Sequence, residues 1–228
     1  TDGSFHLSGN YITYYQTSEE ADITYKTGIL VNQSNLLKDD FVADNLTAVS
    51  TEHAVEGIQL QKETADAFTS LSAASVEAKH SLFASAGYID YASQESAYTY
   101  FLNHFGSDSA DYYTERAGSS EHQTGLAVDI SLTYENNAEL IHTEAYSWLS
   151  ENCTKYGFII RYPEKYASIT GRNEPDHIRY LGKKLAEKVN ASTLCYDEYY
   201  ALYLASWHSK KLIPDKNILN NTDYQGTE

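Results

Sequence analysis

The sequence lacks any long apolar run. No stretch of its 228 residues approaches the roughly 20 apolar residues that a helix needs to cross a bilayer. The opening residues, Thr1-Asp2-Gly3-Ser4, also lack the charged segment and the apolar segment of a secretion signal. We therefore expect any export signal or membrane anchor to lie on a segment outside this sequence.

Basic residues and cysteines are also scarce. The 16 Lys and Arg residues stand against 32 Asp and Glu, and they form no stripe. A phosphate backbone or an anionic membrane is bound through basic patches, so we expect neither nucleic acid nor a charged membrane surface as partner. Cys153 and Cys195 form no CxxC pair; they are either one disulfide or two inert buried thiols, and we favour the thiols.

What is present fits one domain with polar ends. A hydrophobic content of 42% supports a real core. We interpret residues 1–27 as a linker or stalk, 28–205 as the domain and 206–228 as a tail. Apolar periodicity with Gly or Pro stops predicts helices and strands in the domain. The expected helices cover 60–78, 93–105 and 137–156, and the expected strands cover 29–31, 81–88 and 158–162. Because the two types are mixed without βαβ alternation, we predict an α+β fold with a mainly antiparallel central sheet flanked by helices.

The segment from Ser120 to Ile130 carries the first candidate site residues. Apolar and other residues alternate in its second half, so a strand there points Asp129 away from the buried set. A carboxylate in such surroundings needs a cation or a metal ion. Gly125 lets the backbone turn, which brings His122 back beside Asp129.

The second candidate segment is Glu174-Pro175-Asp176-His177. Pro175 favours an extended conformation for Glu174, so Glu174 and His177 share one short segment. A third ligand from His177 leaves the fourth zinc position open, as a catalytic site requires, and Glu174 stands where it can take a proton from water. Taken alone, each histidine is more often hydrogen-bonded or exposed than a ligand. The other six histidines show no such setting and are left at that interpretation.

The two segments resemble the SxHxxGxAxD and ExxH signatures of the VanY-type D-alanyl-D-alanine carboxypeptidases, which share a fold with lysostaphin-like and hedgehog domains. Both signatures are complete, and Tyr156 to Pro163 matches the family's YGFIxRYP segment. The resemblance covers residues 28–200. It implies a Zn²⁺ ion held by His122, Asp129 and His177, with Glu174 as general base. It also places Ser120 and Gln94 near a bound peptide.

The same resemblance implies a biological setting. The substrate is a peptidoglycan stem peptide, and the protein acts outside the bacterial cell or in its envelope. We expect a monomer.

The sequence leaves the family pattern at two positions near the site. Ile89 replaces an arginine that contacts the peptide, and Asp176 replaces a tryptophan. A free carboxylate is held most directly by arginine, so another cation is needed; Arg116 and Arg172 are the candidates, and we favour Arg116 as a substrate-binding residue.

Three functions remain open at this point. The first is a carboxypeptidase that removes a terminal D-alanine from a D,D or an L,D bond. The second is a zinc endopeptidase that cleaves within the stem, which Ile89 favours. The third is a zinc-stabilised wall-binding module without turnover, since a fold alone proves no activity.

We predict one tightly bound zinc ion per chain, because two imidazoles and a carboxylate suit Zn²⁺ better than Mg²⁺ or Ca²⁺. Metal analysis of protein purified without chelator measures the stoichiometry. Absence of metal after refolding with excess zinc would contradict the prediction.

Overall fold

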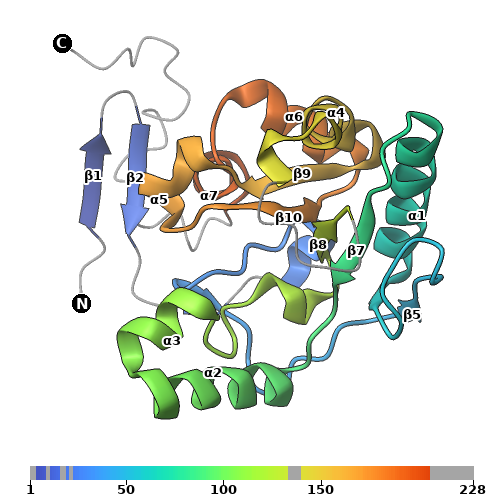
Figure 1. Cartoon of the computed structure of the whole chain (residues 1–228). Helices are drawn as coiled ribbons and strands as arrows, with labels where there is room; N and C mark the ends of the chain where they lie inside the picture. Colours follow the sequence, from blue (N-terminus) through green and yellow to red (C-terminus); the bar gives the residue numbers. More distant parts are fainter. Residues whose placement is uncertain (1–3, 9–10, 16–18, 21–22, 133–139, 206–228) are drawn as a thin grey trace, which may run out of the picture.

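The computed structural model describes residues 4–8, 11–15, 19–20, 23–132 and 140–205, and it has the predicted α+β architecture (Figure 1). Its central sheet has four strands in the order β7-β8-β10-β9, and each neighbouring pair is antiparallel. The strands are β7 (Phe83–Ala86), β8 (Ala127–Ser131), β9 (Phe158–Tyr162) and β10 (Glu174–Tyr180).

Helices lie on several sides of this sheet. In the view of Figure 1, α4 and α6 lie above it, α1 lies to its right, and α2 and α3 lie below it. The helices are α1 (Lys62–Glu77), α2 (Tyr91–Phe105), α3 (Ser107–Tyr113), α4 (Glu144–Asn152), α5 (Ala167–Thr170), α6 (Lys183–Ser192) and α7 (Tyr196–Tyr199). Short paired strands complete the described part: β1 (Ser4–Ser8), β2 (Tyr11–Tyr15), β3 (Glu19–Glu20), β4 (Asn35–Leu36), β5 (Leu46–Ala48) and β6 (Gln59–Gln61).

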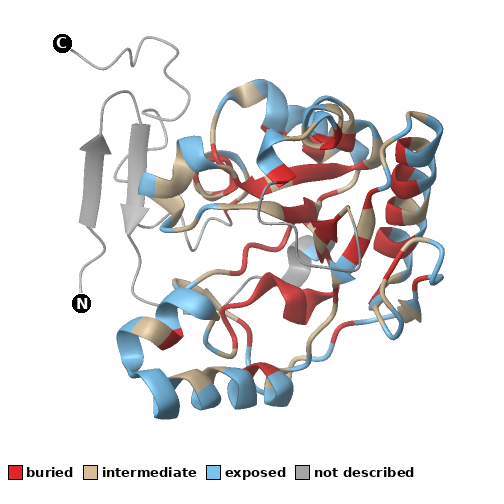
Figure 2. Ribbon diagram, in the orientation of Figure 1, coloured by how far each residue is buried: buried red, intermediate tan, exposed pale blue. Residues whose placement is uncertain are grey.

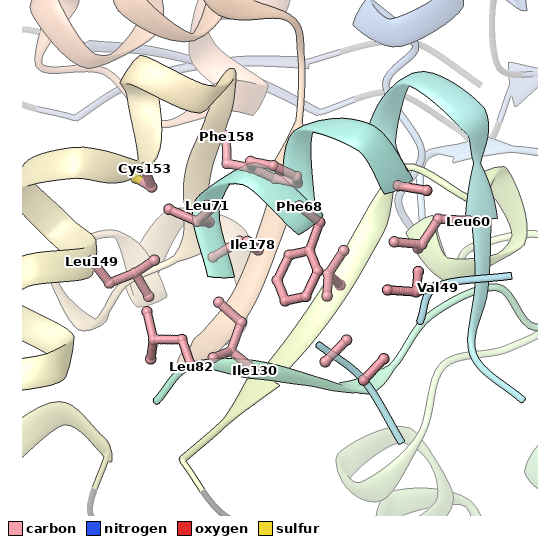
Figure 3. Packing of buried hydrophobic residues seen from close by; sticks show 14 of the residues in the cluster. Val49, Leu60, Phe68, Leu71, Leu82, Ile130, Leu149, Cys153, Phe158 and Ile178 are labelled. Carbon is pink, nitrogen blue, oxygen red and sulfur yellow. The ribbon is translucent and has the colours of Figure 1, made fainter. Parts of the chain in front are cut away.

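The main core forms where α1 packs on the sheet. Phe68 and Leu71 of α1 are fully buried and belong to one cluster with Ile130, Phe158 and Ile178 from three strands (Figure 3). The rings of Phe68 and Phe158 meet edge to face, with centroids 6.3 Å apart. Figure 2 shows β8 and β9 largely buried and most of α2 and α3 exposed. The main core therefore lies on the α1 side of the sheet, and a second apolar cluster joins Ile159 of β9 to Ala186 and Val189 of α6.

Several predicted elements are confirmed. The expected helices 60–78 and 93–105 correspond to α1 and α2, and the expected strands 81–88 and 158–162 correspond to β7 and β9. Gly106 follows α2 with a φ of 82°. The two thiols are also confirmed as free and buried, and burial raises the pKa of each to about 12, which keeps them protonated and unreactive.

The single helix expected over 137–156 is wrong as a continuous element. In its described part, the chain has a 3-10 turn at Leu140–His142, then α4, then a second 3-10 turn at Cys153–Tyr156. The Thr143 hydroxyl accepts a hydrogen bond from the Tyr146 amide at 3.1 Å and starts α4 there. A side-chain cap inside the apolar pattern therefore resets the helix start.

The strand expected at residues 29–31 is also wrong. These residues are buried but belong to no ladder. Side chains bond the backbone where this run begins: Arg179 Nη2 donates to the Ile29 carbonyl at 2.7 Å, and the Tyr196 hydroxyl donates to the carbonyl of the preceding Gly28 at 2.6 Å. The apolar run therefore predicted the burial of these residues correctly but not their strand pairing. Side-chain donors take hydrogen bonds that a partner strand would otherwise supply.

The proposed boundaries of the domain stay predictions. Within residues 1–27, β1 and β2 form an antiparallel pair, and β3 pairs in parallel with β4. The expected tail at 206–228 lies outside the described residues. No helix in the described part of the chain is long and apolar enough to cross a membrane.

We expect Phe68→Ala to lower the free energy of unfolding by about 3–5 kcal/mol, because it leaves a cavity at the centre of the core. Denaturant unfolding measures the loss. Val76→Ala on the same helix is the control: Val76 is 56% exposed, so its truncation should change stability by less than about 0.5 kcal/mol. Equal effects of the two variants would show that α1 does not anchor the core.

Candidate metal centre

Strand register brings two of the predicted ligands together. β8 and β10 are antiparallel neighbours, and the pairing sets His177 directly opposite Asp129. Residues that face each other in this way project from the same side of the sheet. Asp129 and His177, 48 positions apart in sequence, are therefore held at one spot by backbone hydrogen bonding.

His122 reaches the same spot from a short 3-10 turn, Glu121–Thr124. Gly125 ends the turn with a φ of 68° and sends the chain into β8. A Cβ at this position would lie 3.1 Å from the Gln61 amide nitrogen, so both the turn and the close packing favour glycine. The expected role of Gly125 in returning His122 toward Asp129 agrees with this geometry.

The three side chains form a compact group. His122, Asp129 and His177 each offer a ligand atom, and these atoms all lie within 4.8 Å of one another. His122 Nε2 is 3.2 Å from Asp129 Oδ2, and His177 Nδ1 is 2.9 Å from Asp129 Oδ1. The two imidazole rings are nearly perpendicular, with centroids 5.0 Å apart.

Hydrogen bonds on the far side of each ring fix which nitrogen faces the centre. His122 Nδ1 donates to the Gly87 carbonyl at 2.7 Å, which leaves Nε2 as the acceptor. His177 Nε2 lies 3.3 Å from Glu121 Oε2, which leaves Nδ1 directed at Asp129. Such outer partners hold metal-binding histidines in the correct tautomer and orientation. Two nitrogens and a carboxylate with room for a fourth ligand fit a catalytic zinc ion.

The pKa values show how strongly the three groups interact. Burial acts to raise the pKa of Asp129, yet the two histidines hold it well below its ordinary value. Burial acts to lower the pKa of His177, but Asp129 and Glu121 raise it to about 10. A metal ion at Nδ1 must therefore displace a proton, and metal binding should release protons to the solvent.

Glu121 is a functional residue that the sequence analysis missed. Its carboxylate is fully buried, and besides His177 it contacts Arg161 Nε at 2.8 Å and Arg179 Nη1 at 3.0 Å. Burial opposes its ionisation, yet the two arginines and His177 hold its pKa far below the usual range. The available signal was that Arg161 and Arg179 interrupt apolar strands, because a buried arginine calls for a buried acid.

The predicted general base stands at the edge of this group. Glu174 opens β10, three residues before His177, and its side chain is 35% exposed. Arg172 Nη1 lies 2.5 Å from Glu174 Oε1. Burial raises the pKa of Glu174, and Arg172 opposes that rise. The carboxylate is thus partly shielded from water, as suits a base that exchanges a proton with substrate.

The three predicted substrate-binding residues have different settings. Ser120 is fully buried, and its hydroxyl has no hydrogen-bond partner among the described residues. Gln94 Nε2 donates to the Glu115 carbonyl at 2.6 Å and to the Thr114 hydroxyl at 3.1 Å. Arg116 is 61% exposed and is paired with Asp111 at 2.8 Å. Their contact with substrate stays a prediction.

An α+β fold whose antiparallel sheet carries a His-Asp-His group beside a glutamate has the type of site found in metallopeptidases. Comparison with known proteins gives the same class, because the family model described as "VanY: D-alanyl-D-alanine carboxypeptidase" matches residues 57–183. The match covers more than half of the sequence, so the chain belongs to the VanY family. The predicted family is confirmed.

Individual relatives agree with this assignment. The putative carboxypeptidase YodJ of Bacillus subtilis is 34% identical over 179 residues, which cover 75% of this chain and 66% of YodJ. A D-alanyl-D-alanine carboxypeptidase of Enterococcus faecium is 29% identical, over 82% of this chain and 61% of that protein. The chain thus spans about two thirds or less of the curated relatives it matches.

Solved structures confirm the predicted fold. The LdcB LD-carboxypeptidase superposes with a TM-score of 0.70 at 34% identity, over 75% of this chain and 84% of LdcB. A mutant of the D,D-pentapeptidase VanY in complex with Zn(II) gives 0.63 at 31% identity, over 76% of this chain and 98% of VanY.

We expect Glu121→Gln to weaken zinc binding by about 10- to 100-fold, because the amide orients His177 less firmly and removes a charge that balances two arginines. Competition with a chromophoric chelator measures the affinity. Glu198→Gln is the matched control, since Glu198 is also buried but bonds the Cys195 amide at the start of α7. It should affect stability and leave zinc affinity unchanged. Wild-type zinc affinity in Glu121→Gln would show that the contact with His177 is incidental.

Proposed function

We propose that this protein is a zinc-dependent carboxypeptidase that removes a terminal D-alanine from peptidoglycan stem peptides. The observation that supports it most is the convergence of His122, Asp129 and His177 beside Glu174. Family membership adds the substrate class. A solved relative, VanYB, is in complex with D-alanine-D-alanine. We also propose that the protein acts as a monomer, in the bacterial envelope or outside the cell.

Each side chain has a defined task in this reaction. His122 through Nε2, His177 through Nδ1 and Asp129 through a carboxylate oxygen would hold the zinc ion. When bound, zinc polarises the scissile carbonyl and makes water a stronger acid. Glu174 accepts the proton of the attacking water and delivers it to the nitrogen of the departing D-alanine, so one water is consumed and one amide bond is broken.

The stereochemistry of the cleaved bond is the finer question. The solved relatives include the LD-carboxypeptidase LdcB, an L,D-carboxypeptidase DacB from Streptococcus pneumoniae, and the D,D-pentapeptidase VanY. An L,D enzyme removes the D-alanine of a tetrapeptide, whereas a D,D enzyme removes that of a pentapeptide. Both reactions use the same metal ligands and base.

A zinc endopeptidase is the second candidate, and Ile89 is the observation that favours it. The Ile89 amide donates to the carbonyl of His122 at 3.4 Å, so this apolar residue lies against the turn that carries a ligand. An apolar side chain offers nothing to a substrate carboxylate. Incubation with purified muropeptides, read by mass, separates loss of one alanine, cleavage within the stem, and no change. The last result would identify a binding module.

We expect Glu174→Gln to keep the zinc and the fold but to lower turnover by about 10²- to 10⁴-fold, because the amide cannot accept the water proton. Muropeptide turnover and zinc content are measured on the same preparation. His122→Ala is the comparison variant and should lose both metal and activity. Turnover near the wild-type rate in Glu174→Gln would make Asp176 the next candidate for the base.

A further inference from the structure

The proposed substrate ends in a free carboxylate, and this requirement rests on the proposed function. Moving a carboxylate out of water without a cation is costly, and arginine is the side chain that binds it best. The carboxylates of Glu174 and Asp176 lie on β10 beside the metal ligands. Because these groups repel another anion, the site needs a positive side chain within reach of the peptide end.

The other three described arginines, Arg116, Arg161 and Arg179, are already paired with acidic groups away from Glu174. Arg161 and Arg179 are fully buried and neutralise Glu121 behind His177. Arg116 is held by Asp111 Oδ1 and Oδ2 at 2.8 and 2.9 Å, and it lies over the ring of Tyr98 on α2. For none of these three does the described structure give a contact with Glu174.

Arg172 does contact Glu174, and three groups fix its position. Its Nη1 lies 2.5 Å from Glu174 Oε1, and its Nε lies 3.5 Å from Glu115 Oε1. Its guanidinium is 5.8 Å from the ring centroid of Tyr162, whose ring lies 5.2 Å from that of His177. The side chain is 17% exposed, so it is shielded yet still reaches solvent. Arg172 is thus a preorganised cation beside the proposed base, and the ring of Tyr162 lies between it and His177.

We propose that Arg172 is the substrate-binding residue that receives the terminal carboxylate of the peptide. Nη1 donates to Glu174 and Nε forms an ion pair with Glu115, whereas Nη2 has no partner among the described residues, so its two N–H groups are available to a carboxylate oxygen. The assignment places the cation next to Glu174 instead of in the turn at Ile89. It replaces our preference for Arg116.

The two acidic neighbours shape the expected strength of this contact. Glu174 and Glu115 offset most of the charge of Arg172, so its long-range attraction for an anion is small. They also hold the guanidinium in place, so little side-chain freedom is lost when the substrate binds. The contribution should therefore come from direct hydrogen bonding to the carboxylate and should disappear when that group is an amide.

A simpler role for Arg172 is to position Glu174. That role predicts a loss in kcat that is the same for every cleavable peptide. Binding of the carboxylate predicts a rise in KM when Arg172 is replaced, and this rise depends on whether the peptide ends in a carboxylate or an amide. The decisive quantity is the ratio of kcat/KM for a stem peptide with a free C-terminus to kcat/KM for its C-terminal amide.

The experiment measures this ratio for the zinc-loaded wild type, Arg172→Lys and Arg172→Gln, with zinc content determined for each. The peptide is the synthetic stem pentapeptide or tetrapeptide, whichever the wild type cleaves. We expect Arg172→Gln to raise KM for the free peptide by about 10- to 100-fold and to leave KM for the amide within about twofold, as loss of one charge-assisted contact predicts. Arg172→Lys should be intermediate. Lys62→Gln, which removes an exposed charge on α1, is the control for net charge.

Two results would overturn the assignment. Equal losses for both peptides would show that Arg172 only positions Glu174, and a change of the ratio in Arg116→Gln but not in Arg172→Gln would return the role to Arg116. If the wild type cleaves neither peptide, the proposed function fails. Calorimetric binding of the two peptides to the zinc-loaded wild type and Arg172→Gln proteins then decides the role of Arg172 separately.

Discussion

The buried carboxylate of Glu121 is the group on which the centre and its surroundings both depend. It contacts His177 on β10, Arg161 on β9 and Arg179 on β10. Arg161 extends the chain of charges to Asp197 of α7 at 2.6 Å, and Arg179 bonds the carbonyls of Thr27 and Ile29. Removing one partner of a buried charge typically costs about 3–5 kcal/mol, so these contacts are strongly coupled. The orientation of a metal ligand is thereby linked to the packing of both ends of the described domain.

The parts of the structure that the sequence predicts well are those set by local rules. Apolar spacing of three and four residues gives α1, and the glycine at position 157 followed by an apolar run ended by Pro163 gives β9. The candidate metal ligands could be predicted because each lies in a dense local pattern: alternation around Asp129, and Pro175 between Glu174 and His177. The strand register then places His177 opposite Asp129, because the apolar faces of the two adjacent strands must point the same way.

The parts that escaped prediction depend on partners distant in sequence. The carbonyls of Ile29 and Gly28 accept hydrogen bonds from Arg179 and Tyr196, which are about 150 positions or more away and could not be assigned from a local run. The proposed choice of Arg172 over Arg116 also depends on contacts between residues distant in sequence. Arg116 stands close to His122 in sequence, yet Asp111 captures it at the surface. Its neighbour Glu115 faces inward and meets Arg172 instead. Adjacent residues on an irregular segment thus point to different environments, and no periodicity reports which one enters the site.

Carboxylates outnumber cationic side chains at the centre, and their cationic partners hold them in position before a substrate binds. Asp129, Glu174, Glu115 and Asp176 are offset by Arg172 and by the proton on His177, whose pKa Asp129 and Glu121 raise to about 10 against the effect of burial. A proton on His177 and a zinc ion therefore compete for one position and satisfy the same carboxylate. Because the protonated His177 already pairs with Asp129 at 2.9 Å, this carboxylate has a cationic partner without the metal ion. The group that still lacks a cationic partner is the carboxylate of the substrate, and Arg172, which is paired with Glu174 at the edge of the site, is the side chain that we propose for it.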